Sequence, residues 1–441
     1  MINTLQDRLI KTFTKDMDKY CFDYLEMKDK VKNSTAIYRG EPVSFLYQAL
    51  FFSEEEYMQL EGFLAEMISI LNKVILEYKE NTKFRKGFNF SEFLEELILV
   101  DPGYQYYFPI GRFDIFYKEN GDHVFCELNT DGSSAMNEVR VIQEGIKNSQ
   151  IISDIFEDSD VPTGFELFYS WIDELINNYK EFNHGIDDRP NIAIVDFTGD
   201  GTIYEFKEFQ KRFTDKGYKA FICDPRELIY KNSILYYKDY PIKLIYRRAT
   251  TNRILEKALD ISDFLSAYRE GAVCVVGGFV SQIVHSKNLF AILHDNNKNS
   301  FLTEKERDFI KRHIPYTRIL DFTDDKLIKQ ILDNKDKWIL KPFDQYAGKG
   351  VYAGKDFSQD EWKKIIDMIK GRDYILQEFI NIPRMEMLNL EENTKIEKFT
   401  YLIGLFSYNN KLAGLYTRAG RKNIIGSIAE SFTVPNFIFR C

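Results

Sequence analysis

The stretch from Gly111 to Gly132 constrains the fold most, because a turn signal stands in it between two alternating runs. Asn120-Gly121 separates the runs, and this dipeptide favours a two-residue type I′ hairpin turn. Side chains alternate between the two faces of a strand, so a register follows from the turn. Counting outward pairs Glu119 with Asp122, Phe116 with Phe125, Asp114 with Glu127, and Arg112 with Asn129, and leaves Phe113, Ile115, Tyr117, Val124, Cys126 and Leu128 on an apolar opposite face.

The predicted pairing of Asp114 with Glu127 needs a positive charge nearby, because directly opposed carboxylates destabilise a sheet. A hard cation meets that need. Together with the amide oxygen of Asn129, the two carboxylates supply the oxygen ligands that Mg²⁺ prefers. The alternative is an ion pair in which Arg112 neutralises Asp114 and Asn129 is merely polar.

Composition limits the classes of partner. The 441 residues include 68 acidic and 59 basic residues, for a net charge of −9 without a basic cluster, which argues against nucleic acid. The start of the chain lacks a signal-peptide core, and the longest apolar run, 271–280, is too short to span a bilayer. The five cysteines are odd in number and scattered, so a reducing, cytoplasmic setting is expected. The five histidines show no zinc-binding spacing.

Residues 1–100 read as mainly helical. Ser53 and Glu56 form a capping box before an apolar stripe from Tyr57 to Tyr78 at alternating spacings of three and four, which predicts one long helix. Further helices are expected over 136–147, 165–180, 204–214, 286–293 and 358–370, and a capping box of Thr303 and Glu306 opens another that runs to His313.

A βαβ unit is expected after residue 190, with strands at 192–195 and 218–223 around a glycine turn and a helix. Asp224, at the end of the second strand, would suit an NAD ribose, but Tyr204 stands where the dinucleotide motif requires its third glycine. A further strand, 242–246, ends in Arg247 and Arg248, which either bind an anion or are solvated.

A second informative stretch is WILKPF followed by DQYAGKGV, from Trp338 to Val351. A predicted strand delivers Lys341, and the glycines of the following loop would let backbone amides approach phosphate oxygens closely. A glycine turn in a plain hairpin is the alternative. The next apolar strand, 374–380, carries Gln377 and Glu378, polar groups for which an adenine amine would be a good partner. Strands 398–406 and 412–417, joined by an Asn409-Asn410 turn, close the chain.

WILKPF, the AGKGV loop, a helix and YILQEFI together resemble the nucleotide-binding half of ATP-grasp enzymes. The metal-ligand strand of that fold usually comes last, whereas its match here, Asp114 with Glu127 and Asn129, comes first. That order is similar to the circularly permuted ATP-grasp of the glutathionylspermidine synthase family, in its synthetase domain only. The resemblance implies an α/β (α+β) fold with a helical N-terminal region and metal-binding hairpin over 1–185, a Rossmann-like pre-ATP-grasp domain over 186–280 and a nucleotide-binding region over 281–441.

The resemblance also implies roles for residues. Asp114, Glu127 and Asn129 are expected to bind Mg²⁺, and Lys287 and Lys341 to bind the ATP phosphates. Gly348, Lys349 and Gly350 are expected to form a lid over the phosphates. Gln377 and Glu378 are expected to contact the adenine, and Arg112 to bind the transferred phosphate. The chain departs from the family at Tyr346-Ala347, where an Arg-Glu pair is usual, and matches the family's C-terminal arginine segment only loosely at 430–435. The amidase domain of bifunctional members has no counterpart before the hairpin, so Cys21 is expected to be a buried thiol.

The function implied is an ATP-dependent ligase that joins a small-molecule or peptide carboxylate to an amine through an acyl phosphate. Phosphoryl transfer depends on positioning and charge neutralisation, so basic side chains matter more than a nucleophile. Neither nucleic acid nor a membrane is an expected partner. An NAD-dependent oxidoreductase and a nucleotide-binding protein without ligase activity are the alternatives.

Overall fold

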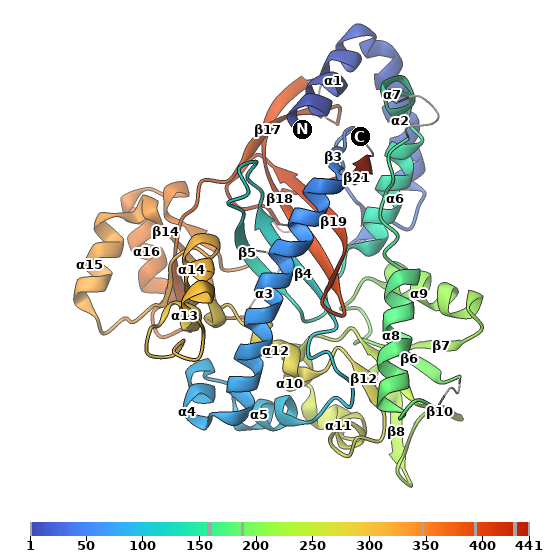
Figure 1. Ribbon diagram of the computed structural model, residues 1–441, viewed down its shortest axis with the longest axis vertical. Helices are drawn as coiled ribbons and strands as arrows, with labels where there is room; N and C mark the ends of the chain where they lie inside the picture. Colours follow the sequence, from blue (N-terminus) through green and yellow to red (C-terminus); the bar gives the residue numbers. More distant parts are fainter. Residues whose placement is uncertain are drawn as a thin grey trace.

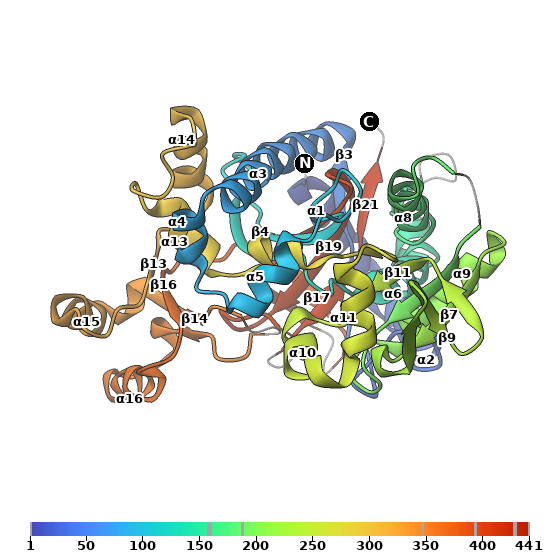
Figure 2. The same ribbon diagram turned by 90° about the horizontal axis from the view of Figure 1, so that it is seen from below.

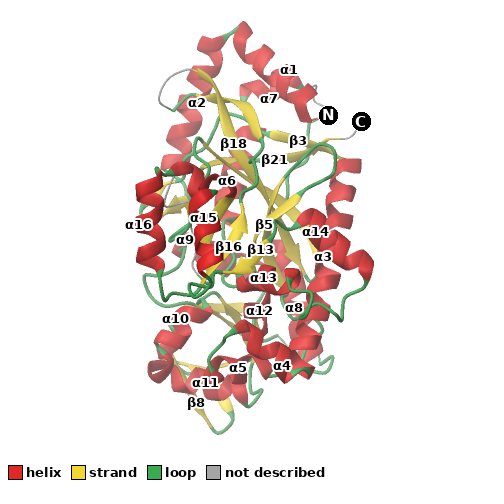
Figure 3. Ribbon diagram, turned by 90° about the vertical axis from the view of Figure 1, so that its left-hand side faces the viewer, coloured by secondary structure: helices red, strands yellow, loops and turns green. Residues whose placement is uncertain are grey.

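The computed structural model describes residues 2–156, 161–186, 189–344, 348–391, 395–426 and 430–439. A six-stranded sheet lies at the centre. On one side of it lies a second, antiparallel sheet with its helices, and on the other side lies a parallel sheet (Figures 1 and 2). Figure 3 shows helices distributed over the outside of all three sheets. Within the described ranges, no helix has both the length and the apolar character needed to cross a bilayer.

The central sheet joins the predicted hairpin to the end of the chain. Its strands in order are β20 (Phe432–Val434), β19 (Lys411–Gly420), β18 (Lys395–Tyr408), β4 (Ile110–Phe116) and β5 (Val124–Asn129), with β17 (Arg384–Asn389) also paired to β18. The long helix α3 (Glu54–Glu80) runs along one face of this sheet (Figures 1 and 2) and begins at the predicted capping box of Ser53 and Glu56. Its apolar stripe is buried in the same core as Phe113 and Ile115.

The hairpin register is confirmed at the residues expected to carry chemistry. Arg112 pairs with Asn129 and Asp114 with Glu127. Beyond Asp114 the register shifts, so Phe116 faces Val124 and the expected pairing with Phe125 is wrong. Cys126 is the extra residue on β5, and such a bulge bends a strand and re-aims its side chains.

The bulge exchanges the two faces of the outer part of β5, whereas β4 keeps the expected faces. Phe125 joins Phe113 and Ile115 in the main core, whereas Val124 and Cys126 pack with Phe116 in a small separate cluster. The turn differs as well, because seven residues separate the strands and Gly121 alone has a left-handed φ, of 82°. Its amide donates to Lys118, so the glycine ends a four-residue turn rather than sharing a two-residue type I′ turn.

The two-residue turn with left-handed geometry occurs at Asn409-Asn410 instead. Both residues have positive φ, 44° and 68°, and they connect β18 to β19 as expected. Positive φ at both central positions is what a type I′ turn requires, and Asn tolerates it better than most residues.

The parallel sheet contains the expected βαβ unit. Its strand order is β12 (Cys274–Val276), β11 (Leu244–Arg247), β6 (Asn191–Val195) and β7 (Lys219–Cys223). Elements packed around it are α8 (Tyr169–Phe182), α9 (Ile203–Asp215), α10 (Thr251–Glu256), α11 (Ser262–Arg269) and a small sheet of β8 (Leu228–Lys231), β9 (Ile234–Tyr237) and β10 (Tyr240–Ile242).

Arg247 and Arg248 are neither solvated nor open to an anion, so both expectations for them are wrong. Each guanidinium is buried. Arg247 pairs with Asp131 at 2.8 Å, and Arg248 pairs with Glu205 at 2.9 Å. These pairs hold the segment after β5 against the edge of the parallel sheet, because Asp131 also accepts from the backbone amide of Thr251.

The third sheet is antiparallel, in the order β13 (Thr317–Ile319), β16 (Tyr374–Glu378), β14 (Trp338–Pro342) and β15 (Tyr352–Ala353). Helices α15 (Asp325–Asp333) and α16 (Gln359–Ile369) share a core with it, and α16 begins at the predicted capping box of Ser358 and Glu361. The helix expected over 286–293 is formed as α13 (Asn288–His294), and Lys287 lies at the break between it and the preceding α12 (Gln282–His285). The expected box of Thr303 and Glu306 opens α14 (Glu304–His313).

The N-terminal region is helical as expected, with one strand that pairs with the end of the chain. β3 (Leu50–Ser53) is parallel to β21 (Asn436–Phe439). Cys21 is only half-buried, so the expectation of a buried thiol is wrong. The remaining elements are α1 (Ile2–Lys15), α2 (Met17–Lys32), β1 (Ile37–Tyr38), β2 (Glu41–Pro42), α4 (Thr82–Arg85), α5 (Glu92–Leu99), α6 (Met136–Lys147) and α7 (Gln150–Ile155).

His123, in the hairpin loop, makes stability depend on pH. Its ring stacks on Tyr117 with centroids 4.6 Å apart, and its Nδ1 accepts from the amide of Lys118. Burial, with a smaller contribution from His313, lowers the pKa of His123 to about 4. The unfolded chain takes up this proton at a higher pH than the folded chain, so stability is lost as the pH falls from about 6.5 towards 4.

We therefore expect His123→Phe to weaken the acid sensitivity. Between pH 6.5 and 4 the free energy of unfolding should fall less steeply in the variant, by about 1.4 kcal/mol per pH unit, because one proton uptake has been removed. Urea unfolding at several pH values measures the two slopes. Equal slopes would contradict a neutral, buried His123.

Candidate functional site

A small pocket lies where the hairpin meets the third sheet and the α12–α13 break. It encloses about 240 Å³ and is here called the hairpin pocket. Four of the residues expected to act line it, namely Glu127, Lys287, Lys341 and Gln377, together with Cys126, Leu128, Val284, His285, Ser286, Phe290 and Ile375.

The two expected lysines lie on opposite sides of the hairpin edge. The Nζ of Lys287 contacts Glu127 Oε1 at 2.6 Å, and the Nζ of Lys341 donates to the carbonyl of Cys126 at 3.1 Å. Both side chains are buried. Although burial alone would raise it, Lys287, Lys341 and His285 hold the pKa of Glu127 near 2. The pocket therefore combines two ammonium groups with a carboxylate that stays ionised.

Three polar residues at this pocket, Gln282, His285 and Asp344, were not among the expected site residues. Asp344 accepts from Gln282 at 2.6 Å and lies 3.6 Å from His285 Nε2. Two buried atoms of this group, His285 Nδ1 and Gln282 Oε1, have no hydrogen-bond partner among the described residues. Buried polar atoms without partners are costly, and a ligand in the pocket would satisfy them.

Asp114 is buried between two arginines. Arg112 Nε donates to its Oδ1 at 2.9 Å, and Arg418, on β19, contacts its Oδ2. Asn129 also donates to Oδ2, at 3.1 Å. Both guanidinium groups lie over the ring of Tyr416, at 5.6 and 5.7 Å. The ion pair that the sequence left as an alternative is thus formed, and Arg418 is a partner that the sequence analysis missed.

The donor set of Asp114, Glu127 and Asn129 fits a hard cation in its chemistry, because two carboxylates and an amide come from paired positions of one hairpin. In this structure their charges are balanced by Arg112, Arg418 and Lys287 instead. In the part of the chain that is described, no group of three or more His, Cys, Asp and Glu side chains could hold a metal ion. Magnesium binding stays a prediction.

The remaining expected residues differ in their relation to the pocket. Gln377 is buried and donates to Thr317 at 2.9 Å, while the side chain of Glu378 is exposed and does not line the pocket. Arg112 directs its Nη1 to the carbonyl of Ser134 at 2.9 Å and its Nε to Asp114 at 2.9 Å. Their roles at the adenine and at the transferred phosphate stay predictions.

The glycine loop forms a turn against the end of the central sheet. Gly348 and Gly350 have φ of 77° and 72°, a region that favours glycine, and the amide of Val351 donates to the carbonyl of Gly348. Asn423, beyond β19, donates to Asp356 at 2.6 Å and so ties the two parts together. Tyr346 and Ala347, where the chain departs from the family, lie outside the described residues.

The C-terminal segment that matches the family only loosely carries an ion pair. Glu430 pairs with Arg421, and Arg421 also contacts Glu397 at 3.1 Å. Arg421 lies four positions beyond the expected closing strands, and no motif in the sequence marked it as a site residue.

Comparison with known proteins gives four findings. A family model described as circularly permuted ATP-grasp type 2 matches residues 50–412. The ATP-grasp enzyme ankG of Aspergillus thermomutatus is 24% identical over 156 residues, which are 33% of this chain and 32% of that protein, so the match spans about a third of that relative. A glutathione synthetase like-effector (GSS30) from Globodera pallida, in its apo form, has a TM-score of 0.59 at 11% identity, covering 95% of this chain and 96% of that one.

A putative gamma-glutamylcysteine synthetase from Methylobacillus flagellatus KT has a TM-score of 0.41 at 11% identity, covering 85% of this chain and 87% of that chain. At these identities the solved structures inform on fold alone.

The setting of Asp114 gives a test of the ion-pair geometry. We expect Asp114→Asn to destabilise the metal-free protein by on the order of 3 kcal/mol, because two buried guanidinium groups lose their carboxylate. Thermal melts in EDTA measure this change. Asp154→Asn, which removes a partly exposed pair with Lys19, is the control and should cost less than about 1 kcal/mol. A higher melting temperature for Asp114→Asn would mean that repulsion from Glu127 dominates.

Proposed function

Because the chain belongs to the circularly permuted ATP-grasp type 2 family, we propose that the protein is an ATP-dependent ligase that joins a carboxylate to an amine. The family and the mixed α/β fold are those that the sequence predicts. The observation that carries the proposal is the hairpin pocket, in which Lys287 and Lys341 flank an ionised Glu127. The curated relative matches only about a third of its own length, so the activity of the whole chain is inferred from this site.

The proposed role of the pocket is to hold the phosphate chain of ATP. Ammonium groups form charge-assisted hydrogen bonds with phosphate oxygens, and burial strengthens them because the local dielectric is low. Lys287 stands at the break between two helices and Lys341 on a strand, so both are fixed by the backbone rather than by a mobile loop. The unpartnered Nδ1 of His285 adds a further polar contact for a ligand.

Asp114, Glu127 and Asn129 are the residues that would hold Mg²⁺. When bound, the ion would neutralise phosphate charge and orient the terminal phosphate. Arg112 and Arg418 lie beside this set and present two guanidinium groups where charge develops as phosphate moves to a carboxylate. The acyl phosphate so formed would then be open to attack by an amine. A peptide-like carboxylate, as in the glutathionylspermidine synthase family, is our proposal for the acid.

The dehydrogenase alternative has less support. Asp224, which would have to hold a ribose, is engaged by the side chain of Arg226 and by the backbone amide of Thr198. A nucleotide-binding protein without ligase activity would use the same lysines, so turnover separates it from a ligase.

The first test concerns Lys341. We expect Lys341→Met to weaken binding of a non-hydrolysable ATP analogue about 10- to 100-fold, because one charge-assisted hydrogen bond is lost while the side-chain volume is kept. Isothermal titration calorimetry measures the affinity. Lys337→Met, which changes an exposed lysine just before the same strand, should bind the analogue as the wild type does. Tight NADH binding that neither variant affects would overturn the ligase proposal.

The second test concerns the glycine loop. Gly348→Ala and Gly371→Ala both put a side chain at a left-handed residue, with φ of 77° and 78°, so each should cost about 1–2 kcal/mol of stability. If the loop closes over phosphates, only Gly348→Ala should also lower ATP turnover, by at least about tenfold. ADP release with pooled carboxylates and amines, beside thermal melts, compares the two. Equal turnover in both variants would mean that the loop is only a structural turn.

A further inference from the structure

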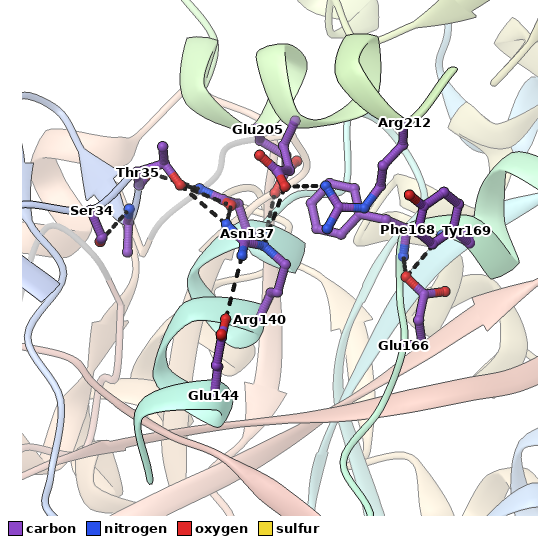
Figure 4. Close-up of polar contacts among 12 residues, drawn as sticks. Ser34, Thr35, Asn137, Arg140, Glu144, Glu166, Phe168, Tyr169, Glu205 and Arg212 are labelled. Atoms are coloured by element: carbon purple, nitrogen blue, oxygen red, sulfur yellow. Dashed lines mark hydrogen bonds and ion pairs between the residues drawn. The ribbon is translucent and has the colours of Figure 1, made fainter. Parts of the chain in front are cut away.

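A second pocket opens between the first turns of α6 and α9 and the β1–β2 segment. It encloses about 260 Å³ and is here called the α6–α9 pocket. Figure 4 shows one edge of it, where Asn137 on α6 donates to Thr35 and lies beside Glu205 on α9. The lining residues are Thr35, Ala36, Ile37, Tyr38, Val43, Ala135, Asn137, Glu138, Thr202, Tyr204 and Glu205.

The charge of this lining is opposite to that of the hairpin pocket. Its ionisable acids are Glu138 and Glu205, and none of the described residues that line it is Lys, Arg or His. Tyr38 and Tyr204 add aromatic faces, which attract cations. The Oγ1 of Thr202 is buried without a hydrogen-bond partner in the described chain, so a polar ligand group would satisfy it. These features favour a positively charged, hydrogen-bonding ligand.

The two glutamates differ in how far the protein already uses them. Glu205 accepts from the backbone amides of Ala135 and Asn137 and pairs with Arg248 at 2.9 Å. The negative charge of Glu205 is therefore already compensated within the protein. Its hydrogen bond with the amide of Ala135 also stabilises that residue at an unfavourable φ of 93°. Within the described ranges Glu138 forms no ion pair, and its side chain hydrogen-bonds to Tyr416, so it is the acid of the two that can pair with a charged ligand.

The charged and titratable groups around Glu138 leave its protonation open near neutral pH. Burial and Glu205 on α9 raise its pKa, whereas Arg112 on β4 and Arg418 and Tyr416 on β19 lower it, with a pKa of about 7 as the result. A cation bound beside Glu138 would favour the carboxylate and displace a proton.

The α6–α9 pocket lies next to the arginines of the candidate site. Arg112 donates from one side of its guanidinium to Asp114 and from the other to the carbonyl of Ser134, which directly precedes the lining residue Ala135. Arg112 and Arg418 thus contact Asp114 and also lie close enough to Glu138 to lower its pKa. A molecule in this pocket would reach the arginines from the side opposite to the nucleotide.

We propose that the α6–α9 pocket binds the amine co-substrate as its ammonium ion, through an ion pair with Glu138. This inference rests on the proposed ligase function and names the substrate class of one of its sites. Residues 35–43, which form one wall, precede the segment 50–412 that the family model matches. The choice of amine is therefore set in part by a segment outside that match.

The test uses two four-carbon probes of opposite charge, 1,4-diaminobutane and succinate, in ligand-observed NMR titrations of the full chain with a non-hydrolysable ATP analogue and Mg²⁺. We expect the wild type to bind the diamine in preference to succinate. Glu138→Gln, which keeps the shape and removes the charge, should bind the diamine at least about tenfold more weakly. Glu144→Gln, an exposed glutamate on the same helix that does not line the pocket, should match the wild type.

A second measurement separates an ion pair from a structural effect. Calorimetry of diamine binding near pH 7, in buffers of different ionisation enthalpy, should show a fraction of a proton released by the wild type and none by Glu138→Gln. Preference for succinate, absence of diamine binding, or unchanged binding in Glu138→Gln would overturn the proposal. The nucleotide titration of the same proteins distinguishes that outcome from failure of the ligase proposal, since Glu138 lies outside the hairpin pocket.

Discussion

The pairing of Asp114 with Arg112 and Arg418 is the interaction on which the candidate site depends. It joins β4 to β19, which are 304 residues apart at the contacting side chains, inside one antiparallel sheet. Since Asp114 is buried, its carboxylate would be left without a counter-ion if both arginines were absent. The hairpin therefore reaches its final electrostatic environment only when the end of the chain has been added to the sheet, as a circular permutation of the fold requires.

Local sequence signals predicted helix starts and turns well, because each of these features depends on residues only a few positions apart. The capping boxes at Ser53, Thr303 and Ser358 all formed, and the Asn409-Asn410 turn joins the two strands that it was expected to join. The bulge at Cys126 was missed because it depends on packing: with it, Phe125 enters the main core instead of facing the polar side. The same pattern of residues is compatible with a regular hairpin, so spacing alone could not reveal the shift.

The sequence predicted those residues of the candidate site that belong to contiguous motifs. Glu127, Lys287, Lys341 and Gln377 do line one pocket. Arg418 and His285 were missed because their roles arise from contacts between distant elements. For Arg247 and Arg248 the sequence suggested a ligand that the structure does not need, because both residues stand at the end of a strand. In the structure their guanidinium groups form ion pairs with Asp131 and Glu205. A strand end identifies where a ligand could bind, but the partner in the fold decides whether the charge is available.

The contact between Glu127 and Lys287 explains how such a charged pocket can be stable without a ligand. Each group is the counter-ion of the other at 2.6 Å, so the protein itself neutralises both. Under the proposed function, phosphate oxygens would compete with Glu127 for Lys287, and Glu127 would then need a new positive partner. A divalent cation could take that place, whereas an anion alone would leave a buried carboxylate unpaired. The geometry thus favours joint binding of nucleotide and metal over binding of either alone, because only together do they replace both halves of the ion pair that they break.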